Sequence, residues 1–101
     1  MNRLLFHPEA QAELISAINY YEGQNIGLGN IFLTEIENSI KKIEKNPTYW
    51  KVLAKEVRRY QVPRFPYSIF YIYLSDLIYI VAIAHNKRRP NYWKERFHDE
   101  S

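Results

Sequence analysis

Apolar and polar positions follow two different periods along the chain, and the period changes near its middle. In the first half, apolar residues recur every three or four positions, which is the spacing of an amphipathic helix. One such stripe runs through residues 8–22 and begins at Pro8, and a second runs through residues 33–43 and stops at Asn46-Pro47. Because residues 23–30 between them hold all three glycines, we expect the two helices to form an antiparallel hairpin.

β-Strand patterns dominate the second half. Residues 57–62, 67–74 and 77–84 are rich in Val, Ile, Tyr and Phe, and a short apolar run at residues 3–6 predicts one more strand at the start. Ser75-Asp76 is a polar turn, so the last two strands should form an antiparallel hairpin. The expected element order is therefore strand, helix, helix, three strands and a short C-terminal segment.

The turn at residues 75–76 also predicts the register of the last hairpin. With an even-length turn, Tyr73 pairs with Ile78 and Tyr71 pairs with Ile80. Apolar residues fall on both faces of this hairpin, so each face should be at least half covered. Only one helical layer is available, and the second face must be closed by the C-terminal tail, a partner or a ligand. One face is expected to carry Tyr67, Ile69, Tyr71, Tyr73, Ile78, Ile80, Ala82 and Ala84, and the other Ser68, Phe70, Ile72, Leu74, Leu77, Tyr79, Val81 and Ile83.

Length and composition limit the class of protein. A chain of 101 residues is expected to form one domain, residues 1–101. It has no cysteine, which excludes disulfides and thiolate metal sites and fits a reducing cytoplasm. The longest apolar stretch, residues 77–84, is too short to span a bilayer. The three histidines do not have metal-ligand spacing, and we expect no metal and no cofactor.

Charge and aromatic residues concentrate at the C-terminal end. Residues 1–46 carry four Lys or Arg against six Asp or Glu, whereas residues 47–101 carry ten against five. If neighbouring strands bring their ends together, cations from two segments should converge at one edge of the uncovered face and bind a polyanion or an acidic partner. Beside them Tyr92 and Trp93 could stack on unpaired bases, although Trp93 could instead pack the tail onto the core. The cations expected to converge are Arg58, Arg59, Arg64, Lys87, Arg88 and Arg89.

Other candidate residues have two interpretations each. His85, at the end of the last strand, could act as a general base or be a hydrogen-bonded structural residue. The tyrosines of the strand at 67–74 could line a groove for a partner or belong to the core of the sheet. The helical carboxylates Glu13, Glu22 and Glu35 are expected to be solvated.

The sequence resembles toxins of the RelE/ParE superfamily from type II toxin–antitoxin systems. The segments that carry the resemblance occur in the same order over nearly the whole chain. They are FHPEAQAEL, YYE, GLGNIFLTEIENSIKKI, NPTYW, RRYQVPRFPYSIFYIY and IVAIAHNKRRPNYW. The resemblance implies an α+β fold with a β-α-α-β-β-β order, in which a twisted antiparallel sheet carries the helical hairpin on one face. It also implies a cytoplasmic bacterial protein that is neutralised by a cognate antitoxin, for which Tyr67, Tyr71 and Tyr73 are the candidate contacts.

Two branches of this superfamily differ in mechanism. The RelE branch cleaves messenger RNA on the ribosome without a metal, and its cationic side chains stabilise charge on the scissile phosphate. Arg59 and Arg88 match cations of that branch, Tyr92 or Trp93 lies near its catalytic tyrosine, and His85 could assist. Gln61 and Ser68, however, stand where that branch has further cations. The ParE branch inhibits DNA gyrase without such a set.

Three functions therefore stay open. The residues favour a toxin that inhibits DNA gyrase, with Arg58, Arg64, Lys87, Arg89 and Trp93 as candidate contacts to the target. The alternative is a ribosome-dependent endoribonuclease, and the third possibility is a member that binds an antitoxin but has lost its toxicity.

Overall fold

The fold begins with a short strand and a helical hairpin whose ends are set by local chemistry. The structure, a computed structural model, describes residues 3–96. β1 (Arg3–Phe6) leads into α1 (Pro8–Gln24), where the His7 side chain accepts a hydrogen bond from the Glu9 N–H and Pro8 occupies the first turn. α2 (Leu28–Lys45) follows after a three-residue link. These elements confirm the predicted strand and helical hairpin.

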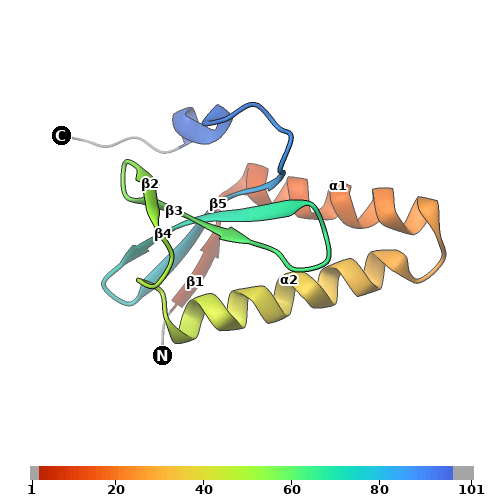
Figure 1. The fold of residues 1–101 in the computed structure, drawn as a ribbon, viewed down its shortest axis with the longest axis horizontal. Helices are drawn as coiled ribbons and strands as arrows, with labels where there is room; N and C mark the ends of the chain where they lie inside the picture. The colour runs from red at the N-terminus through yellow and green to blue at the C-terminus, as the bar shows by residue number, and fades with distance from the viewer. Residues whose placement is uncertain (1–2, 97–101) are drawn as a thin grey trace.

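Four strands and a short 3₁₀ helix follow in the rest of the described chain (Figure 1). The predicted strands are β3 (Val57–Gln61), β4 (Tyr67–Leu74) and β5 (Leu77–His85), and η1 (Tyr92–Arg96) is the C-terminal segment. β2 (Val52–Ala54) was not expected from the sequence. It pairs with β3 across Lys55 and Glu56, which both have positive φ, 50° and 66°, as in a type I′ turn. Because neither residue is Gly or Asn, the sequence carries no ordinary hairpin signal there.

The sheet is mixed rather than wholly antiparallel. Its order is β1-β5-β4-β3-β2, and β1 runs parallel to β5 whereas the other pairs are antiparallel. The predicted α+β layout is thus confirmed, with β1 as a correction to the expected strand direction. A turn fixes the direction of a hairpin, but β1 pairs with a strand about 75 positions later in the chain, so no local signal sets its direction.

The two helices cover one face of the sheet and form the main core with it (Figure 1). α1 and α2 approach closely at Gly29, where an added Cβ would lie 2.7 Å from the backbone oxygen of Ile18. The Glu22 carboxylate accepts hydrogen bonds from the N–H groups of Gly27 and Gly29 and thereby caps α2. Buried residues of this core include Ala10, Ala17, Phe32, Ile36, Ile43, Tyr60, Ile69, Tyr71, Ile78, Ile80 and Ile83.

A β-bulge changes the faces of β5 relative to the prediction. The pairs Tyr73–Ile78 and Tyr71–Ile80 are as predicted, but the register then shifts, so that Phe70 lies opposite Ala82. One extra residue reverses the alternation beyond that point. Ile83 therefore packs with the helices and Ala82 packs on the opposite face, the reverse of the expected placement.

The chain's own C-terminal segment covers part of the second face. Trp93 of η1 is 1% exposed, and its ring lies 5.4 Å from that of Phe70. Together with Val57, Ile72 and Val81 it forms a second, smaller core. The sequence left open whether the C-terminal tail, a partner or a ligand covers this face. In the structure the tail packs on part of it. No helix within residues 3–96 is long and apolar enough to cross a membrane.

Candidate functional site

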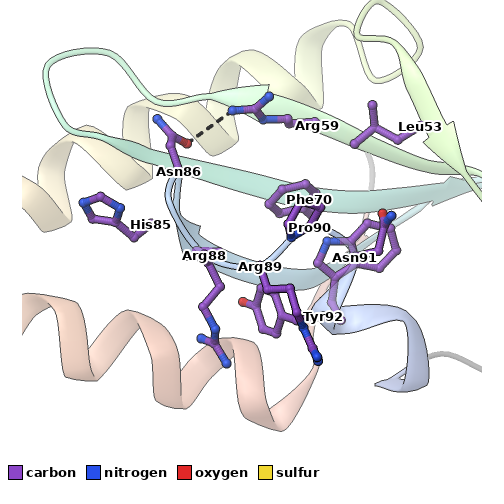
Figure 2. Close-up of a pocket in the computed structure, with 12 residues that line it drawn as sticks. Leu53, Arg59, Phe70, His85, Asn86, Arg88, Arg89, Pro90, Asn91 and Tyr92 are labelled. Carbon is purple, nitrogen blue, oxygen red and sulfur yellow. Dashed lines mark hydrogen bonds between the residues drawn. The ribbon is translucent and has the colours of Figure 1, made fainter.

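A pocket of about 150 Å³ lies where β5 ends (Figure 2). The segment after β5 turns back over the second face of the sheet and forms one wall, and β2, β3, β4 and the end of β5 contribute the rest. The floor is apolar and aromatic, and three guanidinium-bearing residues lie at the rim. The lining residues are Leu53, Arg59, Phe70, Ala84, His85, Asn86, Arg88, Arg89, Pro90, Asn91, Tyr92 and Trp93.

Arg59 is held over this pocket by three polar side chains. Its Nε donates to Ser68 Oγ at 2.9 Å, and one terminal nitrogen donates to Gln61 Oε1 at 3.2 Å. The same terminal nitrogen donates to Asn86 Oδ1 at 3.3 Å (Figure 2). Ser68 Oγ in turn donates to Asn86 Oδ1 at 2.7 Å. Gln61, Ser68 and Asn86 therefore orient the Arg59 guanidinium through neutral polar groups.

Arg88 reaches from the segment after β5 toward α1 (Figure 2). Its guanidinium carbon lies 3.8 Å from the centre of the Tyr92 ring, a cation–π contact, and one of its nitrogens lies 3.8 Å from Glu13 Oε2. Its side chain is 53% exposed. Arg88 thus presents a fixed positive charge at the surface between the pocket and α1.

The hydroxyl of Tyr92 is engaged in a hydrogen bond. It donates to Glu13 Oε2 at 2.6 Å. Burial raises the pKa of Tyr92, and the hydrogen bond to the Glu13 carboxylate raises it further. A hydroxyl that is bonded to a carboxylate and hard to ionise is a poor proton shuttle for a ligand in the pocket. The structure therefore gives Tyr92 the geometry of an anchor for the tail rather than that of a catalytic acid.

His85 is fixed by local contacts. Its Nδ1 accepts the Lys87 N–H at 3.0 Å, and its ring packs edge-on against Tyr67 at 5.4 Å. It lines the pocket together with Arg59, Arg88 and Arg89. The structure therefore brings all four candidate catalytic residues to this pocket, although the Tyr92 hydroxyl is bonded to Glu13; they are Arg59, His85, Arg88 and Tyr92.

The other expected cations do not converge there, and the prediction of one cluster of six is wrong. Arg58 and Arg59 are neighbours on β3, so their side chains point to opposite faces of the sheet. Arg58 donates to the backbone oxygens of Thr48 and Trp50, away from the pocket. Arg64, in the bend after β3, lies 3.5 Å from Glu35 of α2.

The structure decides between the two interpretations of Trp93 and places Lys87 beside the pocket. Trp93 is buried in the second core and offers no exposed ring for a base or a protein target. Lys87 is exposed next to the pocket without lining it, and its contact with a target stays a prediction. Burial of the large indole ring removes much apolar surface from water, which is why Trp93 packs on the sheet face and does not stay exposed.

The tyrosines of β4 lie on the face that the helices cover. Tyr71 is fully buried and its hydroxyl donates to the Pro47 oxygen at 2.9 Å, and burial raises its pKa to about 12. It cannot contact an antitoxin in this structure. Tyr67 and Tyr73 are half-buried and pack against the main core, and Tyr67 also borders a surface hollow with Glu13, Tyr20 and Arg88.

Sequence analysis missed the residues that hold the tail in place. Glu13, expected to be solvated, accepts hydrogen bonds from Arg96, Tyr92 and the N–H of Ile83. The helical spacing did indicate that Glu13 faces inward, because it lies three residues after Ala10 and four before Ala17. Both alanines are buried on the same side of α1. Arg96 carried no signal, because only the tail's return onto α1 brings it to Glu13.

The described part of the chain shows no candidate metal-binding site. Residues 3–96 contain no cluster of three or more His, Asp or Glu side chains arranged to hold a metal ion. The pocket instead combines guanidinium groups, amides and an aromatic floor, which suits an anionic group or an acidic side chain.

Comparison with known proteins agrees with this fold. The sequence model of the family described as "ParE toxin of type II toxin-antitoxin system, parDE" matches residues 4–90. No curated protein sequence matches the chain. A solved structure described as "Chromosomal ParDE TA system from P. aeruginosa" is similar, with a TM-score of 0.62 and 18% sequence identity over 84% of this chain and 96% of that one. The family match spans most of the sequence and includes the strands and the arginines of the pocket, and the chain therefore belongs to the family of ParE toxins of type II toxin–antitoxin systems.

Proposed function

We propose that this protein arrests growth by inhibiting DNA gyrase in the cytoplasm and is neutralised by a cognate antitoxin. The observation that carries the proposal is the hydrogen bond that the Tyr92 hydroxyl donates to Glu13. This bond directs the hydroxyl to the carboxylate and away from the role of proton donor to a ligand. A toxin that acts by binding needs charge and shape at the pocket rim, but it needs no free proton donor. Gln61 and Ser68 support the same interpretation, because they hold Arg59 in place and add no positive charge.

A supercoiling assay tests this proposal. Purified protein is added to gyrase, ATP and relaxed plasmid, and we expect the appearance of supercoiled plasmid to slow as the protein is titrated. Addition of the cognate antitoxin should restore the activity. Unchanged supercoiling at saturating protein would reject gyrase as the target.

A second candidate function is a ribosome-dependent endoribonuclease, and one specific observation favours it. Arg59, His85 and Arg88 line the same pocket, so two cations and one titratable ring are available near a bound phosphate. In that case induction of the protein should produce new 5′ ends within translated codons. If induction neither creates such ends nor slows growth, the remaining explanation is a member that binds its antitoxin without toxicity.

A further inference from the structure

A second basic and aromatic surface lies on the helical side of the sheet, at the C-terminal end of α2. There a hollow of about 250 Å³ is lined by Lys42, Lys45, Asn46, Tyr49 and Trp50. Tyr49 is 78% exposed, although tyrosine is large and mostly apolar. None of the described residues that line the hollow is acidic. We name this surface the Tyr49 surface.

The loop that carries Tyr49 is firmly attached to the sheet. The buried hydroxyl of Tyr71 donates to the oxygen of Pro47. One terminal nitrogen of Arg58 donates to the oxygens of Thr48 and Trp50, at 3.0 and 2.6 Å. Three of the four carbonyls around Tyr49 are thus held by side chains from β3 and β4. The exposed ring is therefore presented from a fixed backbone, which lowers the entropy lost on binding.

Ring packing fixes the orientation of Tyr49 as well. Its ring meets Trp50 edge-on, with centroids 5.0 Å apart at 79°, and Trp50 packs on Tyr60 at 4.8 Å. Tyr60 is buried in the main core. This series of rings runs from the core to the surface and leaves most of the outermost ring in solvent. Such a ring suits stacking on an unpaired base.

Lys42 and Lys45 add positive charge next to this ring. They are three residues apart in the last turns of α2, so they lie on one side of the helix. Lysines there also complement the helix dipole, which would explain their presence without a ligand. The dipole does not, however, explain an exposed aromatic ring on a braced loop. Glu44, the carboxylate nearest to them in sequence, lies with Lys41 along a separate groove on α2.

We propose that the Tyr49 surface binds single-stranded nucleic acid. Tyr49 stacks on an unpaired base, and Lys42 and Lys45 contact the flanking phosphates. An ammonium group is a mobile point charge that follows a flexible phosphate chain without fixing its sequence, so the binding is expected to be sequence-tolerant. This site shares no residue with the pocket at the end of β5, and it does not depend on gyrase being the target.

Binding of a fluorescein-labelled oligothymidylate tests this inference by fluorescence anisotropy on the whole purified chain. We expect saturable binding at low salt that weakens as salt is added. Tyr49→Ala should weaken the affinity roughly tenfold or more, and Tyr49→Phe should preserve it, because stacking needs the ring and not the hydroxyl. The double variant Lys42→Gln/Lys45→Gln should lower the slope of log affinity against log salt by about 1.4, since each phosphate contact on a single strand contributes about 0.7.

Two matched variants locate the site. Lys41→Gln removes a lysine from a different side of α2, and Lys94→Gln removes an exposed lysine of η1 that lines neither the hollow nor the pocket at the end of β5. Both should bind the oligonucleotide as the native protein does. The inference is overturned if the native protein does not bind, if Tyr49→Ala binds equally well, or if loss of Lys94 alone abolishes binding. It is also overturned if a Glu-rich peptide, rather than the oligonucleotide, requires Tyr49, because the surface would then accept an acidic protein segment. These outcomes are independent of the supercoiling assay.

Discussion

Glu13 and Arg96 form a two-point ion pair that joins α1 to the C-terminal segment. The terminal nitrogens of Arg96 lie 2.9 Å from Oε1 and 2.7 Å from Oε2 of Glu13, and both side chains are largely buried, 9% and 17% exposed. Arg96 also donates to the Val81 oxygen, and Glu13 accepts the Ile83 N–H. β1 ends its pairing with β5 at Phe6 and Ile80. After that point the Arg96 and Glu13 side chains form hydrogen bonds with backbone groups of β5. The tail is thereby tied to both the helix and the sheet.

Replacement of Glu13 by Gln should destabilise the protein. The variant removes the closer, buried charged partner of the Arg96 guanidinium, and such losses typically cost about 2–4 kcal/mol in free energy of unfolding. Urea unfolding measures the difference. Glu9→Gln is the matched control, because Glu9 is 67% exposed and lies 3.8 Å from the same arginine, and we expect a change within about 0.5 kcal/mol. Equal effects of the two variants would show that Glu13 does not secure the tail.

The same carboxylate predicts how stability depends on pH. Burial alone would raise the pKa of Glu13, but hydrogen bonds from Arg96, Tyr92 and the Ile83 N–H outweigh it and lower the pKa below the usual 4.5. A carboxyl group whose pKa is lower in the folded state stabilises the protein above the unfolded value, and this contribution is lost as pH falls through the folded value. We therefore expect the free-energy difference between the native protein and Glu13→Gln to be constant near neutral pH. It should shrink in acid below 4.5, and a difference that grows in acid would contradict the assignment.

Tyr71→Phe tests whether β4 holds the loop that carries Tyr49. The hydroxyl is buried and donates to Pro47, so its removal should cost about 1 kcal/mol of stability and leave that oxygen without this donor. Tyr73→Phe on the same strand is the control, because Tyr73 is half-buried and its hydroxyl makes no hydrogen bond within the described residues. Thermal or urea unfolding of both variants gives the comparison. Equal stability of the two variants would mean that the Tyr71 bond does not contribute.

Arg88→Ala should reduce toxicity with little effect on the fold. The side chain is 53% exposed, and its ion pair with Glu13 is long, 3.8 Å, so its loss should change stability by less than about 1 kcal/mol. Growth after induction measures toxicity, and urea unfolding checks the fold. Lys41→Ala on α2 is the control and should remain as toxic as the native protein. If Arg88→Ala also remains fully toxic, the pocket at the end of β5 is not the working surface.

Local patterns of the sequence predicted the two long helices and every described strand except β2, because these elements are set by neighbouring residues. The period of three to four fixed α1 and α2, and the Ser75-Asp76 turn fixed the pairing of Tyr73 with Ile78. The direction of β1 and the bulge near Phe70 depend on contacts between distant segments, and neither leaves a signal in a short window.

The candidate site was harder to predict for the same reason. The sequence predicted that Arg59, His85 and Arg88 lie near one another, because it placed them on neighbouring strands of one sheet or just after them. The prediction put Arg58 and Arg59 in the same cluster, although neighbouring side chains on a strand point to opposite faces of the sheet. The partnership of Glu13 and Arg96 spans 83 positions and arises only when the tail folds back, so the element pattern alone could not reveal it.

Two glycines of the helical hairpin should respond in opposite ways to replacement by alanine. At Gly29 a new Cβ would lie 2.7 Å from the Ile18 oxygen and 3.0 Å from Glu22, which caps α2, so the helices must separate or the cap must break. We expect a loss of about 1–3 kcal/mol in free energy of unfolding. At Gly23, within α1, a Cβ would meet nothing within 4 Å, and alanine is the better helix former, which should stabilise the protein by up to about 1 kcal/mol. Urea unfolding of the two variants gives both signs, and a stabilised Gly29→Ala would refute the close approach of α1 and α2 at this point.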